Sequence, residues 1–176
     1  MGGGYTEKIL IIDLKNKKIK VEKTNLDDTK NFIGAKGLGI KLLIDRLPKG
    51  TDPLSPNNIL MFTTGPLTGT AAQTSGRGTV VTKSPLTSIF VDSHFGGLFA
   101  AEMKKAGWDL IIINDKSTNP VYIIIKDNYI EFKDAKKICG KECLETHNWL
   151  QKNEGKSKTA VIGPAGENLV KFSAIT

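Results

Sequence analysis

The chain of 176 residues has little cysteine, little histidine and no long apolar run. It carries two cysteines and two histidines, whereas a structural zinc site takes four ligands and an iron–sulfur cluster generally takes four cysteines. The longest apolar runs, such as residues 121–125, are strand-sized and far below the roughly 20 residues of a membrane span. No basic segment precedes an apolar stretch at the start, so we expect no signal peptide and a cytoplasmic location.

Arginine is also scarce, although the formal net charge is +7. Only Arg46 and Arg77 stand among the 25 basic residues, and the lysines are spread along the whole chain. Proteins that read nucleic acid favour the bidentate fork of arginine, so a solvated, lysine-rich surface is the better interpretation. We therefore expect no nucleic-acid partner and no membrane partner, while a locally positive cleft for an anionic ligand fits this charge.

The patterning predicts an α+β fold with mixed, largely antiparallel sheets and a few packed helices. Apolar runs indicate strands, and a short turn at residues 15–17 joins the first two as a hairpin. The runs at 110–113, 121–125 and 129–132 indicate a meander. Helical spacing and turn residues mark the other elements. The expected strands are residues 8–14, 18–23, 59–63, 79–82, 88–91, 110–113, 121–125, 129–132, 159–162 and 169–176, and the expected helices are 26–32, 38–47, 96–106 and 141–151.

Two pairs of similar segments indicate an internal duplication. NILMFTTGPLTG (58–69) and KTAVIGPAGEN (158–168) each run a strand into a Gly-Pro turn. GAKGLGIKLL (34–43) and HFGGLFAAEM (94–103) each open a helix with glycines before a leucine. The two pairs are separated by different spacings, so we interpret them as two intertwined repeats and not as one tandem repeat.

One guanidinium among small residues is the clearest candidate binding feature. In QTSGRGT (73–79), small neighbours allow a large planar or anionic ligand to approach the backbone, and Arg77 supplies a fixed fork of donors. The segment starting at His94, with Phe95, Gly96 and Gly97, is a second candidate anion-binding site, because glycines at a helix start expose backbone N–H groups. Two plainer alternatives stay open: an arginine in a hairpin paired with a carboxylate, and a capped strand-to-helix turn.

Other motifs carry less chemistry. GAKGLG (34–39) reverses the dinucleotide fingerprint and follows a helix, so close packing of the helix is the better interpretation. Cys139, Cys143 and His147 would share one helix face, but the number of ligands argues against a metal site. No set of catalytic residues emerges. An enzyme without one generally relies on a cofactor or belongs to a larger protein.

Five segments nevertheless resemble one known family: KILIIDLKNKKIKVEK, GAKGLGIKLL, DPLSPNNILMFTTGPLTGT, GRGTVVTKSPLT and IGPAGENLVKFSAI. In order and spacing they are similar to the N-terminal domain of the tungsten-containing aldehyde ferredoxin oxidoreductases. The resemblance covers essentially the whole chain. It implies that residues 1–176 are the domain that cradles the tungstopterin, without the C-terminal end of that domain and without the later cluster-binding domains.

The resemblance implies part of an enzyme that oxidises aldehydes to carboxylic acids and passes the electrons to ferredoxin. The cofactor implied is a tungsten (or molybdenum) bis-molybdopterin with a bridging magnesium ion. A [4Fe–4S] cluster is implied for the full enzyme only, because its ligands are not in this chain. Expected partners are the remaining domains of the same enzyme, ferredoxin and an aldehyde, with a homodimer as an option. The isolated fragment is expected to be inactive, and a non-catalytic binding or assembly module is the alternative.

Four site residues carry over by position, and none of them is catalytic. Arg77 falls on the arginine that the family places between pterin and cluster. His94, Phe95 and Gly96 fall on the loop whose main chain helps to hold the magnesium ion between the pterin phosphates. The family commonly has asparagine where His94 stands and an aromatic residue where Gly78 stands. A main-chain role at position 94 would survive this departure, whereas a side-chain role would not.

Overall fold

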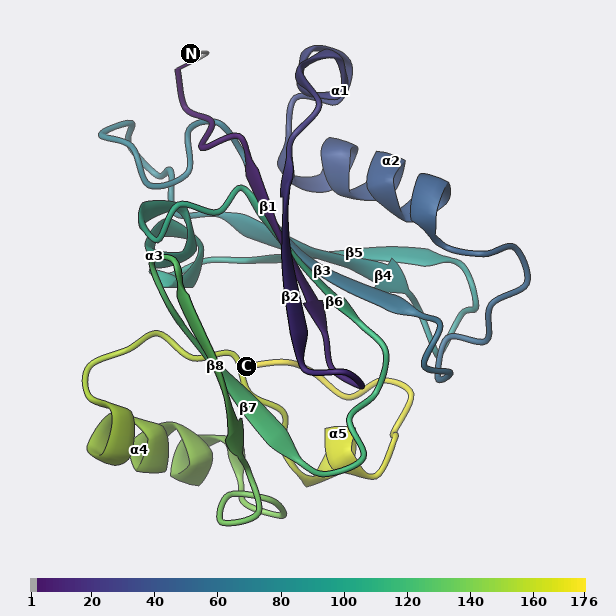
Figure 1. Ribbon diagram of the computed structural model, residues 1–176, viewed down its shortest axis with the longest axis vertical. Coiled ribbons are helices and arrows are strands. Elements are labelled where there is room, and N and C mark those ends of the chain that lie inside the picture. Colours follow the sequence, from purple (N-terminus) through teal and green to yellow (C-terminus); the bar gives the residue numbers. More distant parts are fainter. Residues whose placement is uncertain (1–2) are drawn as a thin grey trace.

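The computed structural model describes residues 3–176, which form a six-stranded sheet, a two-stranded sheet and five helices (Figure 1). Met1 and Gly2, part of the start on which the expectation of no signal peptide rests, lie outside the described residues. The strands are β1 (Lys8–Asp13), β2 (Lys18–Lys23), β3 (Ile59–Thr64), β4 (Gly78–Lys83), β5 (Phe90–Phe95), β6 (Leu110–Asn114), β7 (Val121–Lys126) and β8 (Tyr129–Asp134), and the helices are α1 (Leu26–Phe32), α2 (Ala35–Arg46), α3 (Phe99–Lys105), α4 (Cys143–Glu154) and α5 (Pro164–Glu167).

The larger sheet has the order β2-β1-β6-β3-β4-β5 and is mixed. Strands β1 and β6 run parallel, with Ile11 opposite Ile112, and the other four pairings are antiparallel. Both of these strands are apolar on both faces because both faces of the sheet are covered. The predicted α+β class with mixed, largely antiparallel sheets is confirmed.

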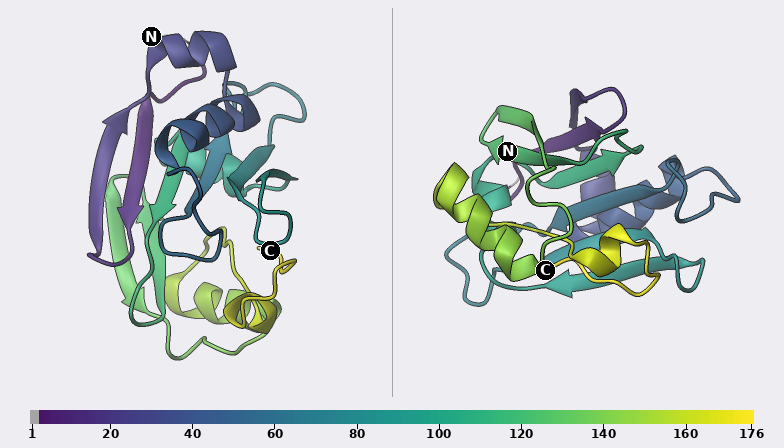
Figure 2. Two further views of the ribbon diagram at one scale, coloured as in Figure 1. Left: turned by 90° about the vertical axis from the view of Figure 1, so that its right-hand side faces the viewer. Right: turned by 90° about the horizontal axis from the view of Figure 1, so that it is seen from below.

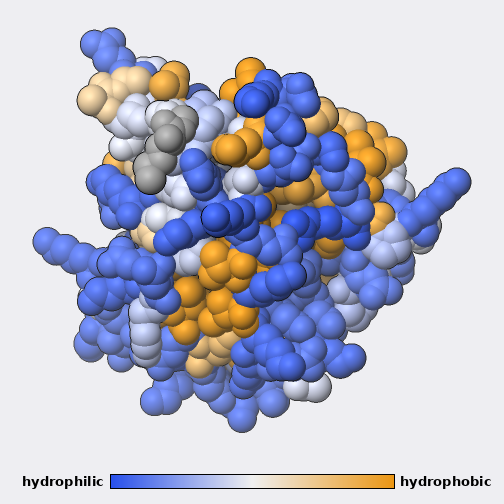
Figure 3. All heavy atoms as spheres, turned by 45° about the horizontal axis from the view of Figure 1, so that its top comes forward, coloured by the Kyte–Doolittle hydropathy of each residue, from blue (hydrophilic) through white to orange (hydrophobic). Residues whose placement is uncertain are grey.

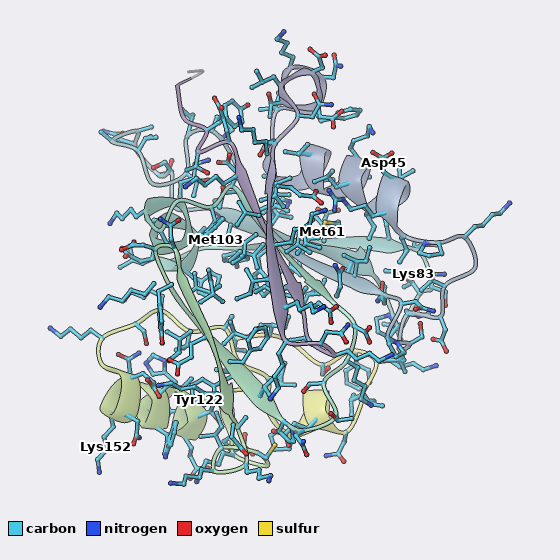
Figure 4. All side chains as sticks on the ribbon, in the orientation of Figure 1. Asp45, Met61, Lys83, Met103, Tyr122 and Lys152 are labelled. Atoms are coloured by element: carbon cyan, nitrogen blue, oxygen red, sulfur yellow. The ribbon has the colours of Figure 1, made fainter. Side chains whose placement is uncertain are left out.

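Two hydrophobic clusters lie on opposite faces of the larger sheet. Helix α2 covers one face, where Leu38 and Leu42 pack with Met61. Helix α3 and the β7–β8 pair cover the other face, where Met103 and Trp108 lie among apolar strand residues. Figure 4 shows Met61 and Met103 on the two sides of the sheet. Helices α1 and α2 lie at one end of the molecule and α4 and α5 at the other, as Figure 1 and Figure 2 show.

A smaller cluster joins α4 to the β7–β8 pair. Leu150 of α4 is buried with Ile138, and the rings of Trp149 and Tyr122 meet edge to face with centroids 6.1 Å apart. Hydrophilic residues cover most of the face shown in Figure 3, with apolar residues in separate patches between them. Within residues 3–176, every helix is too short or too polar to cross a membrane.

The structure corrects three expectations about strands. The meander over residues 110–132 is wrong, because β6 inserts between β1 and β3 while β7 and β8 form a separate sheet. The strand expected at 88–91 is displaced to Phe90–Phe95, since Ser84 and Ser88 close a turn before it. Residues 159–162 and 169–176 are not strands: they share one reciprocal pair of hydrogen bonds, between Val161 and Thr176 (2.8 and 2.9 Å), and no ladder continues it.

Three helix starts also differ from the sequence patterns. Helix α2 begins at Ala35, three residues before the start expected at 38. Helix α3 begins at Phe99, so Gly96 and Gly97 precede the helix and do not form its first turn. Helix α4 begins at Cys143, and Gly140 with φ of 74° breaks the chain direction before it. Cys139 is therefore not on the helix that carries Cys143, and the shared helix face expected for the cysteines does not exist.

Candidate functional site

The four predicted site residues converge at one end of the β4–β5 pair. Arg77 immediately precedes β4, whose first residue Gly78 stands opposite Phe95. His94 stands opposite Thr79, and the chain leaves β5 directly into Gly96. The antiparallel pairing of β4 and β5 thus brings together two segments that are distant in the sequence, because Gly78 and its partner Phe95 are 17 residues apart. We call Arg77, His94, Phe95 and Gly96 the β4–β5 end site.

The main chain of Arg77 is fixed by the loop at residues 65–77, which connects β3 to β4. Buried Thr68 is the centre of this loop: its hydroxyl accepts from the N–H of Gly65 (3.0 Å) and donates to the carbonyl of Arg77 (2.9 Å). Across the same loop, the N–H of Gly69 donates to the carbonyl of Ser75 (3.2 Å). These contacts hold the backbone from which the arginine side chain extends.

The guanidinium of Arg77 is exposed and differs from that of Arg46, which binds Glu22 at 2.6 Å. Among the carboxylates of residues 3–176, none lies within ion-pair distance of Arg77. The alternative of a hairpin arginine paired with a nearby carboxylate is therefore wrong. An arginine without an acidic neighbour keeps all its donors available for an anion.

The loop that carries Arg77 lies against the turn that follows β5. A Cβ on Gly76 would come within 2.8 Å of the carbonyl oxygen of Gly97, so only glycine allows this approach. Gly97 itself has φ of 79°, which favours glycine at the turn. Gly96 is different, because a Cβ there would meet no heavy atom within 4 Å. The backbone at Gly96 is thus open toward the space in front of it.

His94 lies on the outer edge of the larger sheet, where β5 has no further neighbour among residues 3–176. The N–H of Ser84 donates to the carbonyl of Ile89 (2.8 Å), which marks that pair as hydrogen-bonded. Hydrogen-bonded and non-hydrogen-bonded pairs alternate along an antiparallel ladder, so the Thr79–His94 pair is non-hydrogen-bonded. The main-chain N–H and C=O of His94 consequently point away from β4, off the edge of the sheet.

The side chains of His94 and Phe95 lie on opposite faces of the sheet. His94 is on the face that α2 covers. Phe95 is on the other face, where its ring centroid lies 6.3 Å from that of Phe62 and 5.8 Å from that of Phe99. The ring of Phe95 also covers Gly78, where a Cβ would come within 2.4 Å of Phe95 Cζ. No larger side chain fits at position 78 in this arrangement, which accounts for the glycine there.

A hollow of about 420 Å³ adjoins the site and was not anticipated from the sequence. Its wall is mostly apolar, and it lies between the turn after β5, the first two turns of α4 and the last segment of the chain. Its residues come from three distant segments, so no local pattern could have shown it. They are Gly96, Leu98, Phe99, Cys143, Leu144, His147, Lys158, Thr159, Val161 and Thr176.

The glycines of GAKGLG do not take part in this site. A Cβ on Gly39 would come within 2.8 Å of Val81 Cγ2, and one on Gly37 within 2.4 Å of the carbonyl of Phe32. The interpretation of this motif as close helix packing is confirmed. Cys139 is exposed overall. Partial desolvation of its thiol, and then the negative charge of Glu167, raise the pKa of Cys139, which favours the neutral thiol.

An α+β domain that offers a free guanidinium, an open glycine backbone and an unpaired main-chain edge at one point is equipped to bind an anionic group. The chain belongs to the family of the aldehyde ferredoxin oxidoreductase N-terminal domain, whose model matches residues 9–176. It is 48% identical to the tungsten-containing aldehyde ferredoxin oxidoreductase of Pyrococcus furiosus over 98% of this chain and 29% of the relative.

Two further comparisons extend the family. The chain is 35% identical to the aliphatic sulfonate oxidoreductase, WOR-like subunit, of Pyrococcus furiosus, over 97% of this chain and 30% of that protein. The fold matches a chain of the active site complex BamBC of benzoyl coenzyme A reductase with a TM-score of 0.97 at 38% identity, over 100% of this chain and 27% of that one. The chain thus spans less than a third of the length of these relatives, and the part that it matches is the N-terminal domain described by the family model.

Proposed function

We propose that residues 1–176 form the cradle for a tungsten bis-molybdopterin cofactor in an enzyme that oxidises aldehydes to carboxylic acids. The observation that carries this proposal is the β4–β5 end site, where Arg77 has no carboxylate partner among residues 3–176 and lies next to an open glycine turn. The named relative at 48% identity contains tungsten and acts on aldehydes, which supports the same metal and substrate here.

The residues of the site fit an anionic, phosphate-bearing group. A Cβ at Gly96 would enter empty space, so the backbone there allows a bulky group to come close. Arg77 would donate hydrogen bonds from its guanidinium to the pterin, since its main chain is already fixed through Thr68. The outward carbonyl of His94 would help to hold the magnesium ion of the cofactor, because hard cations take oxygen ligands. When bound, the cofactor supplies the two-electron oxidation chemistry.

The other parts of the function belong to the rest of the protein. In this proposal, later domains complete the pterin site and hold a [4Fe–4S] cluster, and ferredoxin accepts the electrons in the cytoplasm. The relatives named for an aliphatic sulfonate and for benzoyl coenzyme A share this N-terminal fold, so the substrate is selected outside the cradle. Residues 3–176 contribute binding and positioning through Arg77 and the main chain of His94.

Replacement of Arg77 in the complete enzyme tests the proposal. We expect Arg77→Ala to lower the tungsten content per protein by about tenfold or more and activity in proportion, because the charge-assisted hydrogen bonds from the guanidinium to the cofactor are lost. Arg77→Lys keeps the charge but loses the fork, so an intermediate content is expected. Lys152→Ala, which removes an exposed cation of α4 (Figure 4), is the matched control. Full tungsten content in Arg77→Ala contradicts the cradle and favours a non-catalytic binding or assembly module.

A further inference from the structure

Asp92 connects His94 to helix α2. It lies two residues before His94 on β5, so both side chains project from the same face of the sheet. One carboxylate oxygen, Oδ2, lies 3.2 Å from Nε2 of His94, and the other, Oδ1, lies 3.0 Å from the ammonium of Lys36. The side chain of Asp92 is only 16% exposed, whereas that of His94 is 50% exposed. The carboxylate is therefore held more firmly than the ring it contacts.

The second nitrogen of the His94 ring is also occupied. Its Nδ1 lies 2.9 Å from the hydroxyl oxygen of Thr79, which is 1% exposed and stands directly opposite on β4. Close side-chain contact is expected for a non-hydrogen-bonded pair. In the neutral ring with its proton on Nε2, the Thr79 hydroxyl donates to Nδ1, and the protonated nitrogen is the one that lies 3.2 Å from the carboxylate of Asp92.

This geometry separates the ring of His94 from its main chain. The ring is fixed on the face of the sheet that α2 covers, while the carbonyl points off the sheet edge. A ring that is free to rotate would allow the end of β5 to twist, because an edge strand is bonded on one side only. Fixing both ring nitrogens fixes this end of the strand without using any main-chain group of His94.

We propose that Asp92 and Thr79 are positioning residues that act through the His94 ring to hold the main-chain oxygen of His94 toward the cofactor. This inference rests on the proposed function, since it assumes that the oxygen serves the magnesium–phosphate unit. Lys36 neutralises Asp92 and orients its second oxygen, so the first turn of α2 belongs to the same chain of contacts. In this proposal, the position of β5 relative to α2 determines the direction of the His94 main-chain oxygen.

The test uses the complete enzyme and measures tungsten per protein together with the midpoint of thermal unfolding. We expect Asp92→Asn to lower tungsten content by about tenfold, as removal of an outer partner of a metal ligand typically does. Thr79→Val should lower it in the same way and Thr79→Ser should restore it, because only the hydroxyl matters. Asp27→Asn, which breaks an exposed ion pair with Lys30 at 3.5 Å, is the control for loss of a carboxylate.

A double-mutant cycle separates positioning from a structural role. His94→Asn removes the ring, so Asp92→Asn should have no further effect on tungsten content in that background. An equal loss in both backgrounds shows that Asp92 acts through Lys36 and α2 alone and overturns the inference. Full tungsten content in both Asp92→Asn and Thr79→Val also overturns it. If those two variants are normal while Arg77→Ala loses tungsten, the positioning role alone is wrong; if Arg77→Ala is also normal, the proposed function itself is wrong.

Discussion

Gly76 and Gly97 meet backbone to backbone, closer than any side chain at position 76 would allow. The 2.8 Å approach of a Cβ to the Gly97 carbonyl oxygen means that Gly76→Ala must move one of the two loops. We expect a loss of about 1–3 kcal/mol in the free energy of unfolding, as overpacking typically costs. Urea unfolding measures it. Gly96→Ala is the matched variant, because its Cβ meets no atom within 4 Å and its stability should stay within experimental error.

The same two variants separate stability from binding. If the open backbone at Gly96 receives the cofactor, Gly96→Ala should keep its unfolding midpoint and still lose tungsten, since the new methyl group occupies the approach path. Gly76→Ala should lose both. Elemental analysis and thermal unfolding of the same preparations distinguish the two. Normal tungsten content in Gly96→Ala would exclude close contact at that residue.

Asp109 ties the start of the chain to the core and should be the most sensitive polar residue. It is 2% exposed, its carboxylate accepts from the N–H groups of Thr6 and Glu7 (2.7 Å for the latter), and it contacts the ammonium of Lys104. Asp109→Ala leaves a buried ammonium without its partner, so we expect a loss of about 3–5 kcal/mol. The double variant Asp109→Asn with Lys104→Met should lose less, and chemical denaturation decides between additive and non-additive losses.

The contact of α4 with the β7–β8 pair should depend on pH at both ends of the scale. Hydrogen bonds from Lys133 and Tyr122 lower the pKa of Glu154, so its contribution to stability is complete above its unfolded value and is lost as pH falls through the lowered one. Burial, and then the hydrogen bond to Glu154, raises the pKa of Tyr122 to about 12. The contribution of Tyr122 is therefore lost as pH rises from about 10 to about 12.

Thermal unfolding across pH measures this contact. Tyr122→Phe should remove the alkaline loss that this residue causes and leave part of the acid loss, because Lys133 still binds Glu154 at 2.7 Å. Glu154→Gln should weaken both. An unchanged alkaline profile in Tyr122→Phe would show that the tyrosine does not titrate with unfolding.

Gly78 and Phe95 provide a prediction about the aromatic side of the site. The ring of Phe95 occupies the volume that a side chain at position 78 would need. Gly78→Ala should displace that ring and expose its surroundings, which lowers the unfolding midpoint. Combining Gly78→Ala with Phe95→Leu makes room at the cost of aromatic contacts, so the double variant should be more stable than the sum of the two losses predicts.

Local patterns in the sequence were sufficient for elements that lie wholly within one segment. The β1–β2 hairpin and α2 follow from apolar runs and helical spacing, and their bounds agree with the patterns to within a few residues. The place of β6 could not be predicted, because an apolar run does not say which strands flank it. The strand character of His94 was missed for another reason: Ser93, His94 and Gly96 are polar or flexible, and only pairing with β4 extends the strand to Phe95.

The site itself was partly visible in the sequence. Arg77 and the segment from His94 to Gly96 could be named because glycines and a lone arginine mark them, and the family resemblance joined them. The sequence could not show that a hydroxyl on β4 and a carboxylate on β5 hold the ring of His94, since these contacts need the register of the pair. The hollow beside Gly96 was equally invisible, because its walls come from segments far apart in the chain.

The insertion of β6 between β1 and β3 also determines the order in which this domain can be made. During synthesis, the β1–β2 hairpin and the β3–β4–β5 ribbon emerge first, but neither pairs with the other in the finished sheet. Helix α2 packs on strands from both, but the facing edges of β1 and β3 stay unpaired until Leu110–Asn114 leaves the ribosome and pairs with each of them. Such long-range pairing is slow to form and exposes strand edges meanwhile. A nascent chain that pauses before residue 110 is therefore the species most in need of a chaperone.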